Sequence, residues 1–406
     1  MNRQVDVLVV GAGPAGLAAA ARLAAAGAGR VEVLERESTA GGAPRHCAHP
    51  GFGSAARGRP LDGPAYARGA VRAALRAGAT IRTRASVTGW AGAGPATGTL
   101  AVEVTAPGGP EVVGARAVIL ATGARERPRS ARLVPGTRPA GVMTTGELQR
   151  TAALPARLRD LAGRRAVVVG GDPVTRHAVL ALRAAGAEVA AVVTEGPRAL
   201  GTGGVPVLAE TVVTELLGRG RLTGVAVRAR DGRAGILRCD TVVFTGDWIP
   251  EHELARRGGV PLAPGSRGPL VDGRFRTAVP GVFAAGDLLR GVEPARVAAA
   301  EGRSVAAAVL DRLAGARTGP DEVPVEAAGA LRWVVPGLLG AEPVPLLVRV
   351  GRPLDRPVLS VSQAGVPLRR ERLPARLVPW RSVRLGPHWT GGADPEGGPV
   401  VVSAGE

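Results

Sequence analysis

Three glycines near the start of the chain have the spacing of a phosphate-binding turn. Residues 5–16 read Val-Asp-Val-Leu-Val-Val-Gly-Ala-Gly-Pro-Ala-Gly, an apolar run that leads into Gly11, Gly13 and Gly16. The first glycine permits the tight bend, the second lets the backbone approach a pyrophosphate, and the third lets the next helix pack closely. That helix points its N-terminal amides at the phosphates. The pattern predicts a dinucleotide site, with Pro14 and Ala15 in the same turn.

Two further passages narrow the choice of nucleotide. Glu35 ends a second apolar run, about 20 residues after the turn, where a carboxylate can accept both ribose hydroxyls. Arg36 follows it. Far downstream, the passage from Thr277 to Asp287 reads Thr-Ala-Val-Pro-Gly-Val-Phe-Ala-Ala-Gly-Asp. Together these passages indicate FAD rather than NAD at the first turn.

The elements that must position these motifs follow a repeated α/β pattern. A first cycle predicts strands at residues 5–10, 31–34, 81–90, 100–105 and 112–121, with helices at 14–26 and within 63–78. A Pro/Arg-rich passage, 126–139, leads to a second cycle, with strand 166–169, turn 170–175, a helix to 185 and strand 189–193. Further strands are expected near 207–213, 223–230 and 241–244, and a helix near 297–313.

We therefore expect an α/β fold with two Rossmann-like dinucleotide-binding domains. Residues 1–125 and 265–320 would form a discontinuous FAD-binding domain, and residues 126–264 an inserted NAD(P)-binding-like domain. Residues 321–406 are rich in Pro, Val and Leu and predict a small β-rich C-terminal domain. Its expected strands lie at 346–350, 358–362 and 376–378.

The motifs resemble those of the pyridine nucleotide–disulfide oxidoreductase superfamily over about residues 1–315. Ala121-Thr122-Gly123 and the passage that ends in Gly286-Asp287 match two of its motifs. The resemblance implies that Asp287 bonds the ribityl chain of FAD and that the backbone of Val87 faces the adenine. It also implies that the helix start near Ala298 points its positive end at the flavin. The other cofactor contacts that it implies are Gly42, Ala121, Thr122, Gly123 and Gly286.

A narrower resemblance lies in two stretches, residues 121–128 and 139–149. They are similar to the flavoprotein subunits of opine oxidases, hydrogen cyanide synthase and related amine or hydroxyproline dehydrogenases. They also resemble oxidoreductases that accompany glycerol-3-phosphate dehydrogenases. This implies electron transfer with a second dehydrogenase subunit as one candidate partner, beside a small-molecule substrate or nicotinamide. Companion proteins of this type often hold an iron–sulfur cluster on a cysteine-rich extension, and this tail contains no cysteine.

The chain departs from the disulfide reductases of the superfamily at Cys47. Those enzymes use two closely spaced cysteines beside the flavin, whereas only Cys47 follows Gly41-Gly42 here. A dithiol relay is therefore excluded at this position. Cys47 as a single redox thiol and His46 as a flavin-facing polar group are the candidate catalytic residues. The alternative is that Cys47 is a small buried residue, and the dispersed histidines predict no metal site.

The second turn is degenerate. It reads Gly-Gly-Asp-Pro-Val-Thr from Gly170, so Asp172 replaces the middle glycine and its carboxylate would repel a pyrophosphate. Arg176 could offset that charge, and Glu195 stands where a ribose-binding acid could lie. Binding of NAD(P)H at this turn therefore stays open.

Charge and composition exclude several other classes. The net charge is +18 and arises from arginine alone, but the arginines are scattered and aromatic residues make up 2% of the chain. Without aromatic groups for base stacking, nucleic-acid binding is not expected; a basic surface instead favours anionic substrates or an acidic partner. We also expect no disulfide, no membrane span and a cytoplasmic location, and oligomerisation remains possible.

The sequence thus predicts an FAD-dependent oxidoreductase that passes electrons between bound FAD and NAD(P)H or a partner subunit. One alternative is a subunit of a dehydrogenase complex whose own cleft oxidises a small amine, opine or hydroxy acid. Its carboxylate anchor would be Arg45, Arg125 or Arg127. Another alternative is a non-catalytic FAD-containing scaffold.

Overall fold

The structure, a computed structural model, divides the chain into two compact units. It describes residues 2–54, 58–92, 94, 100–154, 159–161, 164–316, 323–340 and 342–406. Unit 1 comprises residues 1–45, 52–124 and 250–406, and unit 2 comprises residues 46–51 and 125–249. The two strands at these crossings, β9 (Ala124–Glu126) and β18 (Trp248–Pro250), pair with each other. The expected domain end at residue 320 lies outside the described residues.

A seven-stranded sheet forms the centre of unit 1. Its order is β5-β2-β1-β8-β7-β6, and β19 pairs with the end of β8. Strands β5, β2, β1, β8 and β19 run parallel, whereas β6 to β8 form an antiparallel meander. The bounds are β1 (Asn2–Val10), β2 (Val31–Leu34), β5 (Thr80–Arg82), β6 (Ser86–Trp90), β7 (Ala101–Ala106), β8 (Gly109–Leu120) and β19 (Val282–Ala284).

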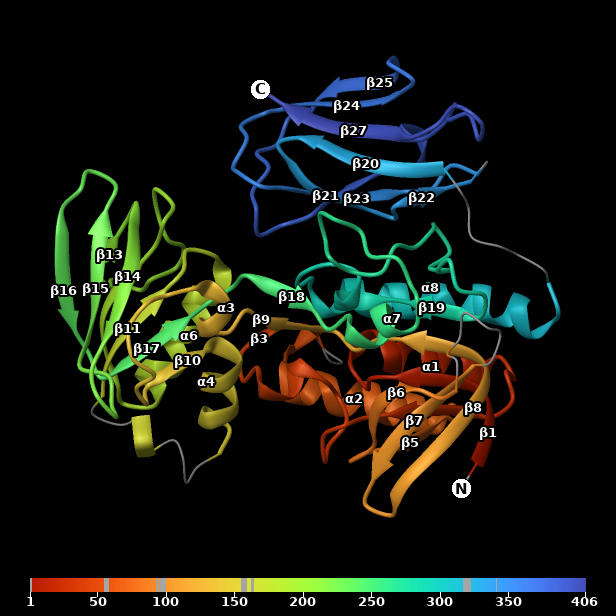
Figure 1. Ribbon diagram of the computed structural model, residues 1–406, viewed down its shortest axis with the longest axis horizontal. Helices are drawn as coiled ribbons and strands as arrows, with labels where there is room; N and C mark the ends of the chain where they lie inside the picture. Colours follow the sequence, from red (N-terminus) through yellow and green to blue (C-terminus); the bar gives the residue numbers. More distant parts are fainter. Residues whose placement is uncertain are drawn as a thin grey trace. The chain divides into compact units, whose positions relative to one another are not determined.

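Three long helices belong to this sheet: α1 (Pro14–Ala25), α2 (Gly63–Arg76) and α8 (Ala295–Leu313) (Figure 1). Val7 and Val9 of β1 face a core that α1 and α8 share, and Leu8 and Val10 face a second core on the other side of the sheet. Both faces of β1 are buried, which explains its continuous apolar run. Each fully buried Val or Leu side chain contributes about 1.5–3 kcal/mol.

The C-terminal region folds as two stacked β-sheets within unit 1 (Figure 1). One sheet has the order β22-β20-β27-β24-β25 and the other β21-β23-β26, with an apolar core between them. The expected strand at 376–378 is wrong: Leu377 and Val378 form only isolated bridges, because Pro374 and Pro379 flank them and lack the N–H that a ladder needs. The bounds are β20 (Val323–Gly329), β21 (Leu331–Val335), β22 (Leu338–Leu339), β23 (Leu346–Val350), β24 (Val358–Gln363), β25 (Val366–Arg372), β26 (Val383–Leu385) and β27 (Val400–Gly405).

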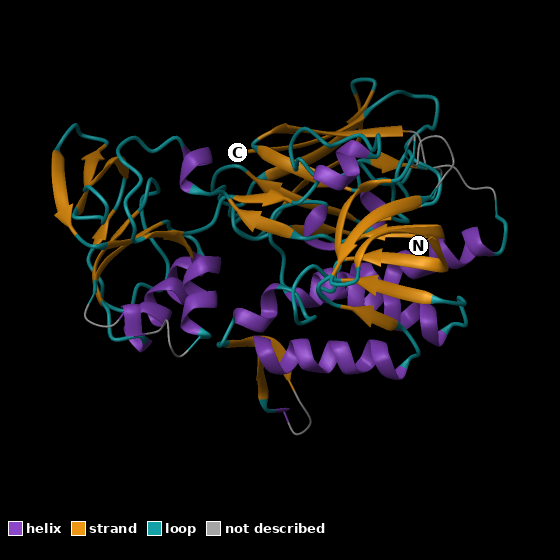
Figure 2. Ribbon diagram, turned by 60° about the horizontal axis from the view of Figure 1, so that its bottom comes forward, coloured by secondary structure: helices purple, strands orange, loops and turns teal. Residues whose placement is uncertain are grey.

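Unit 2 repeats the α/β plan on a smaller scale. Its five-stranded parallel sheet, in the order β10-β17-β11-β12-β13, is joined by an antiparallel sheet, β14-β15-β16. Figure 2 shows helices and strands mixed in both units, and the predicted fold class is confirmed. The bounds are β10 (Val142–Thr144), α4 (Thr145–Ala152), β11 (Arg165–Val169), α6 (Pro173–Ala184), β12 (Glu188–Val193), β13 (Val207–Leu208), β14 (Thr211–Leu217), β15 (Gly224–Ala229), β16 (Ala234–Arg238) and β17 (Thr241–Phe244).

Short elements complete both units. They are β3 (Pro50–Ser54), β4 (Pro60–Asp62), α3 (Arg129–Arg132), α7 (Glu253–Arg257) and the 3-10 turns at Ala43–His46, Arg159–Leu161, Gly286–Leu288 and Pro387–Trp389. No helix in the part of the chain that the structure describes is long and apolar enough to span a membrane.

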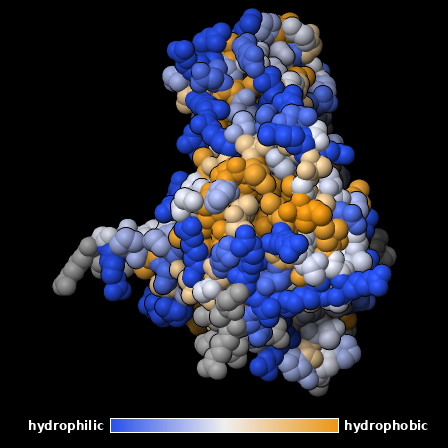
Figure 3. Space-filling model, turned by 90° about the vertical axis from the view of Figure 1, so that its left-hand side faces the viewer, coloured by the Kyte–Doolittle hydropathy of each residue, from blue (hydrophilic) through white to orange (hydrophobic). Residues whose placement is uncertain are grey.

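Strand β16 of unit 2 carries an exposed apolar side chain. Ile236 of β16 lies opposite Ala226 of β15 and is 65% exposed. On the face drawn in Figure 3, apolar residues gather among hydrophilic ones.

Candidate functional site

The turn between β1 and α1 has room above it for a bound group. Gly11 has φ +106°, and a Cβ atom there would lie 2.4 Å from the carbonyl oxygen of Ala121. A Cβ atom on Gly16 would lie 2.0 Å from the carbonyl oxygen of Gly11. Both positions therefore require glycine for backbone reasons. Gly13 differs, because its φ is −83° and nothing lies within 4 Å of a Cβ atom there.

The N-terminus of α1 begins at this open position. Gly13 is the N-cap residue, Pro14 follows at the first helical position, and no side chain caps the helix. Uncapped helix N-termini offer backbone N–H groups and a partial positive charge to an anion. A second glycine loop lies against the same turn, because a Cβ atom on Gly42 would be 2.7 Å from the Cα of Gly13. This cradle of backbone suits a phosphate group.

Glu35 follows β2 directly and lies at the edge of this backbone cradle. Its buried carboxylate accepts hydrogen bonds from the backbone N–H of Ala12 (3.1 Å) and Glu37 (2.9 Å). Two fixed donors orient the carboxylate, and its remaining lone pairs can accept ribose hydroxyls. The neighbouring Arg36 is largely exposed and pairs with Glu251 at 3.8 Å.

The segment after β8 lies at the same edge of the sheet. The backbone N–H of Ala121 donates to Val10 (2.9 Å), and the hydroxyl of Thr122 donates to the carbonyl of Glu251 (2.8 Å). Gly123 has φ +78°, with open space where a side chain would be. Val87 lies in β6, opposite Val104, in the meander of the same sheet.

The Gly286-Asp287 motif follows β19 and packs against the first turn. A Cβ atom on Gly286 would lie 2.7 Å from the Cβ of Ala15 and 3.8 Å from that of Ala298. The structure therefore brings together two motifs that are far apart in the sequence. The Asp287 carboxylate accepts a hydrogen bond from the backbone N–H of Glu293 (3.1 Å). Burial raises the pKa of Asp287 to about 7.

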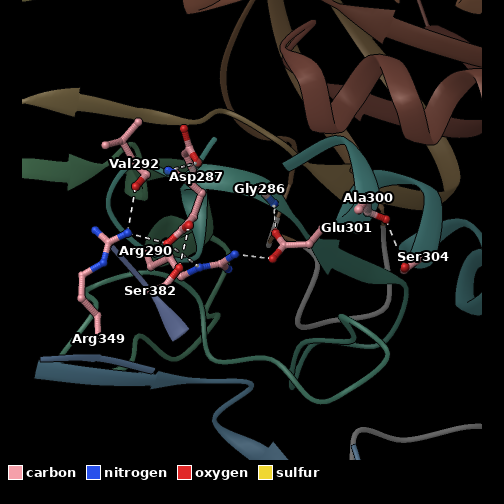
Figure 4. Close-up of polar contacts among 10 residues, drawn as sticks. Gly286, Asp287, Arg290, Val292, Ala300, Glu301, Ser304, Arg349 and Ser382 are labelled. Atoms are coloured by element: carbon pink, nitrogen blue, oxygen red, sulfur yellow. Dashed lines mark hydrogen bonds and ion pairs between the residues drawn. The ribbon is translucent and has the colours of Figure 1, made fainter. Parts of the chain in front are cut away.

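Charged side chains that the sequence analysis did not single out surround Asp287 (Figure 4). Arg290 is fully buried and pairs with Glu301 of α8, whose carboxylate also accepts the N–H of Gly286 (3.0 Å). Nη1 of Arg290 has no hydrogen-bond acceptor among the described residues, so it remains as a donor for a bound group or for water. No local pattern in the sequence marked Arg290, which lies in a bend between the turn Gly286–Leu288 and α8.

The candidate residues Cys47 and His46 belong to unit 2, whereas the FAD motifs belong to unit 1. The Cys47 thiol donates to Oε1 of Gln149 (3.6 Å). Burial and the nearby Glu126 charge raise the pKa of Cys47 to about 11, so the reactive thiolate is disfavoured. His46 ends a 3-10 turn. A redox role for either residue stays a prediction.

Two other histidines stack in unit 2. The rings of His49 and His177 lie 3.6 Å apart and nearly parallel. Burial lowers the pKa of His177 to about 4, which keeps its ring neutral at pH 7. In the part of the chain that the structure describes, no group of three or more His, Cys, Asp or Glu residues could hold a metal ion.

The degenerate second turn is filled by its own side chain. Asp172 is the N-cap residue of α6, and its Oδ1 accepts from the backbone N–H of Val174 (3.0 Å) and Thr175 (3.2 Å). These are donors that a pyrophosphate would use at such a helix end. The carbon chain of Arg176 packs over Gly201, and Glu195 is exposed after β12.

Acidic groups lie beside candidate carboxylate anchors. Arg45 pairs with Glu37, and Arg127 pairs with Asp247 (3.1 Å). Arg125 is exposed. An arginine that is already paired binds a substrate carboxylate only in exchange for its present partner.

Comparisons with known proteins agree with this architecture. A family model described as pyridine nucleotide-disulphide oxidoreductase matches residues 5–302. One of the subunits of the opine oxidase of Agrobacterium tumefaciens (strain Ach5) is 36% identical over 165 residues, which is 37% of this chain and 30% of that relative. The match thus spans less than a third of the curated relative.

Solved structures show the same fold. The thioredoxin reductase of T. acidophilum superposes with a TM-score of 0.61 at 24% identity, over 76% of this chain and 98% of that one. The bacillithiol disulfide reductase of Bacillus cereus gives a TM-score of 0.62 at 21% identity, over 76% and 100%.

Proposed function

The chain belongs to the pyridine nucleotide-disulphide oxidoreductase family, and on this premise we propose that it is an FAD-dependent oxidoreductase whose electrons are exchanged with a small-molecule substrate or a partner subunit. The family places it among oxidoreductases that generally depend on flavin and a nicotinamide nucleotide. The observation that carries the FAD assignment is the open backbone cradle at Gly13, with the Glu35 carboxylate at its rim.

The residues around the cradle have complementary tasks. The backbone N–H groups that start α1 would bind the pyrophosphate, and Glu35 would accept the ribose hydroxyls. Asp287, which lies beside the first turn, would accept a hydrogen bond from a hydroxyl of the ribityl chain. FAD bound there supplies reversible two-electron transfer.

Helix α8 adds an electrostatic contribution. It is 19 residues long, and no side chain caps its N-terminus after Pro294. The positive end of such a helix stabilises negative charge in front of it. The isoalloxazine of bound FAD would carry more negative charge when reduced, so the N-terminus of α8 would favour the reduced form if it faced that ring.

Asp172 supports an electron donor other than NAD(P)H. Its carboxylate is the resident acceptor at the N-terminus of α6, and burial raises its pKa. A pyrophosphate would have to displace this group and accept like-charge repulsion. Unit 2 would then have a structural role and would not bind a nicotinamide nucleotide.

The similarity to a component of an opine oxidase supports a partner subunit, since that relative is named as one subunit of an oxidase. Small amines, opines and hydroxy acids are the corresponding substrate class. The basic net charge of +18 also suits an anionic substrate or an acidic partner.

Substitution of Gly13 by alanine tests the FAD assignment. Gly13 has ordinary φ and open space at its Cβ position, so Gly13→Ala should fold like the wild type. The new methyl group would occupy the cradle and weaken FAD binding by about tenfold or more, which corresponds to about 1.4 kcal/mol. The measurement is the dissociation constant of FAD by flavin fluorescence.

A matched control is available in α2. Gly69→Ala adds the same methyl group, also with no atom within 4 Å, but away from the turn. We expect it to bind FAD like the wild type. Equal FAD affinity for the wild type and both variants would contradict the assignment.

A further inference from the structure

Two side chains of the C-terminal region hold one residue of the loop that follows Asp287. Glu293 lies near the end of this loop, directly before Pro294, the N-cap residue of α8, and is 7% exposed. Its Oε1 accepts from Nη2 of Arg349 in β23 (2.5 Å), and its Oε2 accepts from the hydroxyl of Ser382 (2.7 Å) (Figure 4). Both carboxylate oxygens are therefore held by the C-terminal region.

The same residue connects the C-terminal region to the candidate FAD site. The backbone N–H of Glu293 donates to Oδ1 of Asp287 (3.1 Å). Arg349 also donates to the carbonyl of Val292 (3.0 Å), so two consecutive loop residues are held by one guanidinium. Arg349 is thus linked to the Asp287 carboxylate by hydrogen bonds through Glu293.

Arg349 supplies one of the two positive charges in this cluster. Asp287, Glu293 and Glu301 are three acidic groups that interact with Arg290 and Arg349. Four of these residues are buried and Asp287 is partly buried, so water cannot fully replace a lost partner. The ring of Trp333 in β21 covers both guanidinium groups. Its centroid lies 5.0 Å from Cζ of Arg349 and 5.8 Å from Cζ of Arg290.

We propose that Arg349 is a positioning residue for FAD: through Glu293 it fixes the loop that presents the Asp287 carboxylate to the cofactor. The C-terminal region then contributes to FAD binding. The proposal rests on the proposed function, since it needs FAD at Asp287.

The experiment compares full-length Arg349→Met and Arg349→Lys with the wild type. FAD dissociation constants are measured by flavin fluorescence, the environment of bound flavin by visible circular dichroism, and apoprotein stability by thermal unfolding. Arg349→Met should weaken FAD binding at least tenfold and change the visible dichroism. Arg349→Lys keeps the charge and should restore part of the affinity.

Two more variants separate positioning from folding. Ser382→Ala removes the second donor to Glu293 without a change of charge, so it should fold normally and weaken FAD binding by a few fold. Arg352→Met, in the same region, removes an exposed arginine that pairs with Glu406 at 2.8 Å. It should leave FAD binding unchanged.

Each outcome has a distinct meaning. If the wild type binds FAD and Arg349→Met and Ser382→Ala bind it equally well, the proposal is overturned. If Arg349→Met loses both stability and FAD while Ser382→Ala keeps full affinity, Arg349 has a structural role alone, and the proposal is also overturned. If the wild type itself binds no FAD, the proposed function fails instead.

Discussion

Asp287 has a carboxyl group whose ionisation is costly in the apoprotein. The pKa of about 7 arises first from burial, and the N–H of Glu293 and the charge of Arg290 offset it only in part. In the unfolded chain the pKa of the same group is near its ordinary value of 3.8. Between these values the folded state binds more protons than the unfolded state, so this group makes stability fall as pH rises.

This pH dependence of stability can be tested by comparing the wild type with Asp287→Asn. The variant carries no titrating group at this position, so its apoprotein should gain stability relative to the wild type as pH rises from about 4 to about 7. Above and below this window the difference should be constant. Thermal unfolding of both apoproteins across the pH series measures it. A difference that does not vary with pH would show that Asp287 is ionised throughout.

Single residues differ in how far the sequence could predict them. The glycines of the first turn and Glu35 follow a local spacing whose physical reasons are known, so they could be singled out. Arg290, Glu293 and Arg349 could not, because their roles arise from ion pairs and hydrogen bonds with groups elsewhere in the chain. No local period marks which arginine of a sequence this rich in arginine will be buried.

At the scale of the elements, the N-terminus of α6 differs from that of α1 in a way that affects nucleotide binding. Both helices begin with proline after a glycine-rich turn, but α1 has Gly13 at its N-cap and α6 has Asp172. From the sequence alone, Asp172 was expected to repel a pyrophosphate. The structure adds that it caps the helix, and an acidic N-cap followed by proline is a signal that the sequence already contained.

Substitution of Asp172 by glycine tests whether the cap excludes a nucleotide. Asp172→Gly frees the N–H groups of Val174 and Thr175, and we expect the variant to bind NADH where the wild type does not. The cost in stability should be small, about 0.3 kcal/mol, because glycine is a tolerated N-cap. Isothermal titration with NADH and thermal unfolding measure the two effects.

The control is a second aspartate cap. Asp62 caps α2 through the N–H of Ala65 (2.7 Å), so Asp62→Gly removes a comparable cap without opening the second turn. It should lose similar stability and gain no NADH binding. The account of Asp172 fails if Asp172→Gly binds NADH no better than Asp62→Gly.

For the whole molecule, the α/β architecture was accessible from the sequence because strands and helices differ in apolar period and are separated by glycine turns. The C-terminal sheets were predicted only as a β-rich region. Their packing on the rest of unit 1 depends on long-range contacts, such as Trp333 in the core beneath the first sheet. The contribution of this region to the flavin site could therefore be inferred only from the structure.

The most direct test of the central claim is an anaerobic titration of the FAD-loaded protein with NADH and NADPH. The flavin absorption near roughly 450 nm reports reduction. We predict that the protein binds FAD and that stoichiometric nicotinamide leaves this band unchanged, whereas dithionite bleaches it. Rapid bleaching by either nicotinamide would contradict the claim that electrons come from a substrate or a partner subunit, and a protein that binds no FAD would contradict the flavoprotein assignment itself.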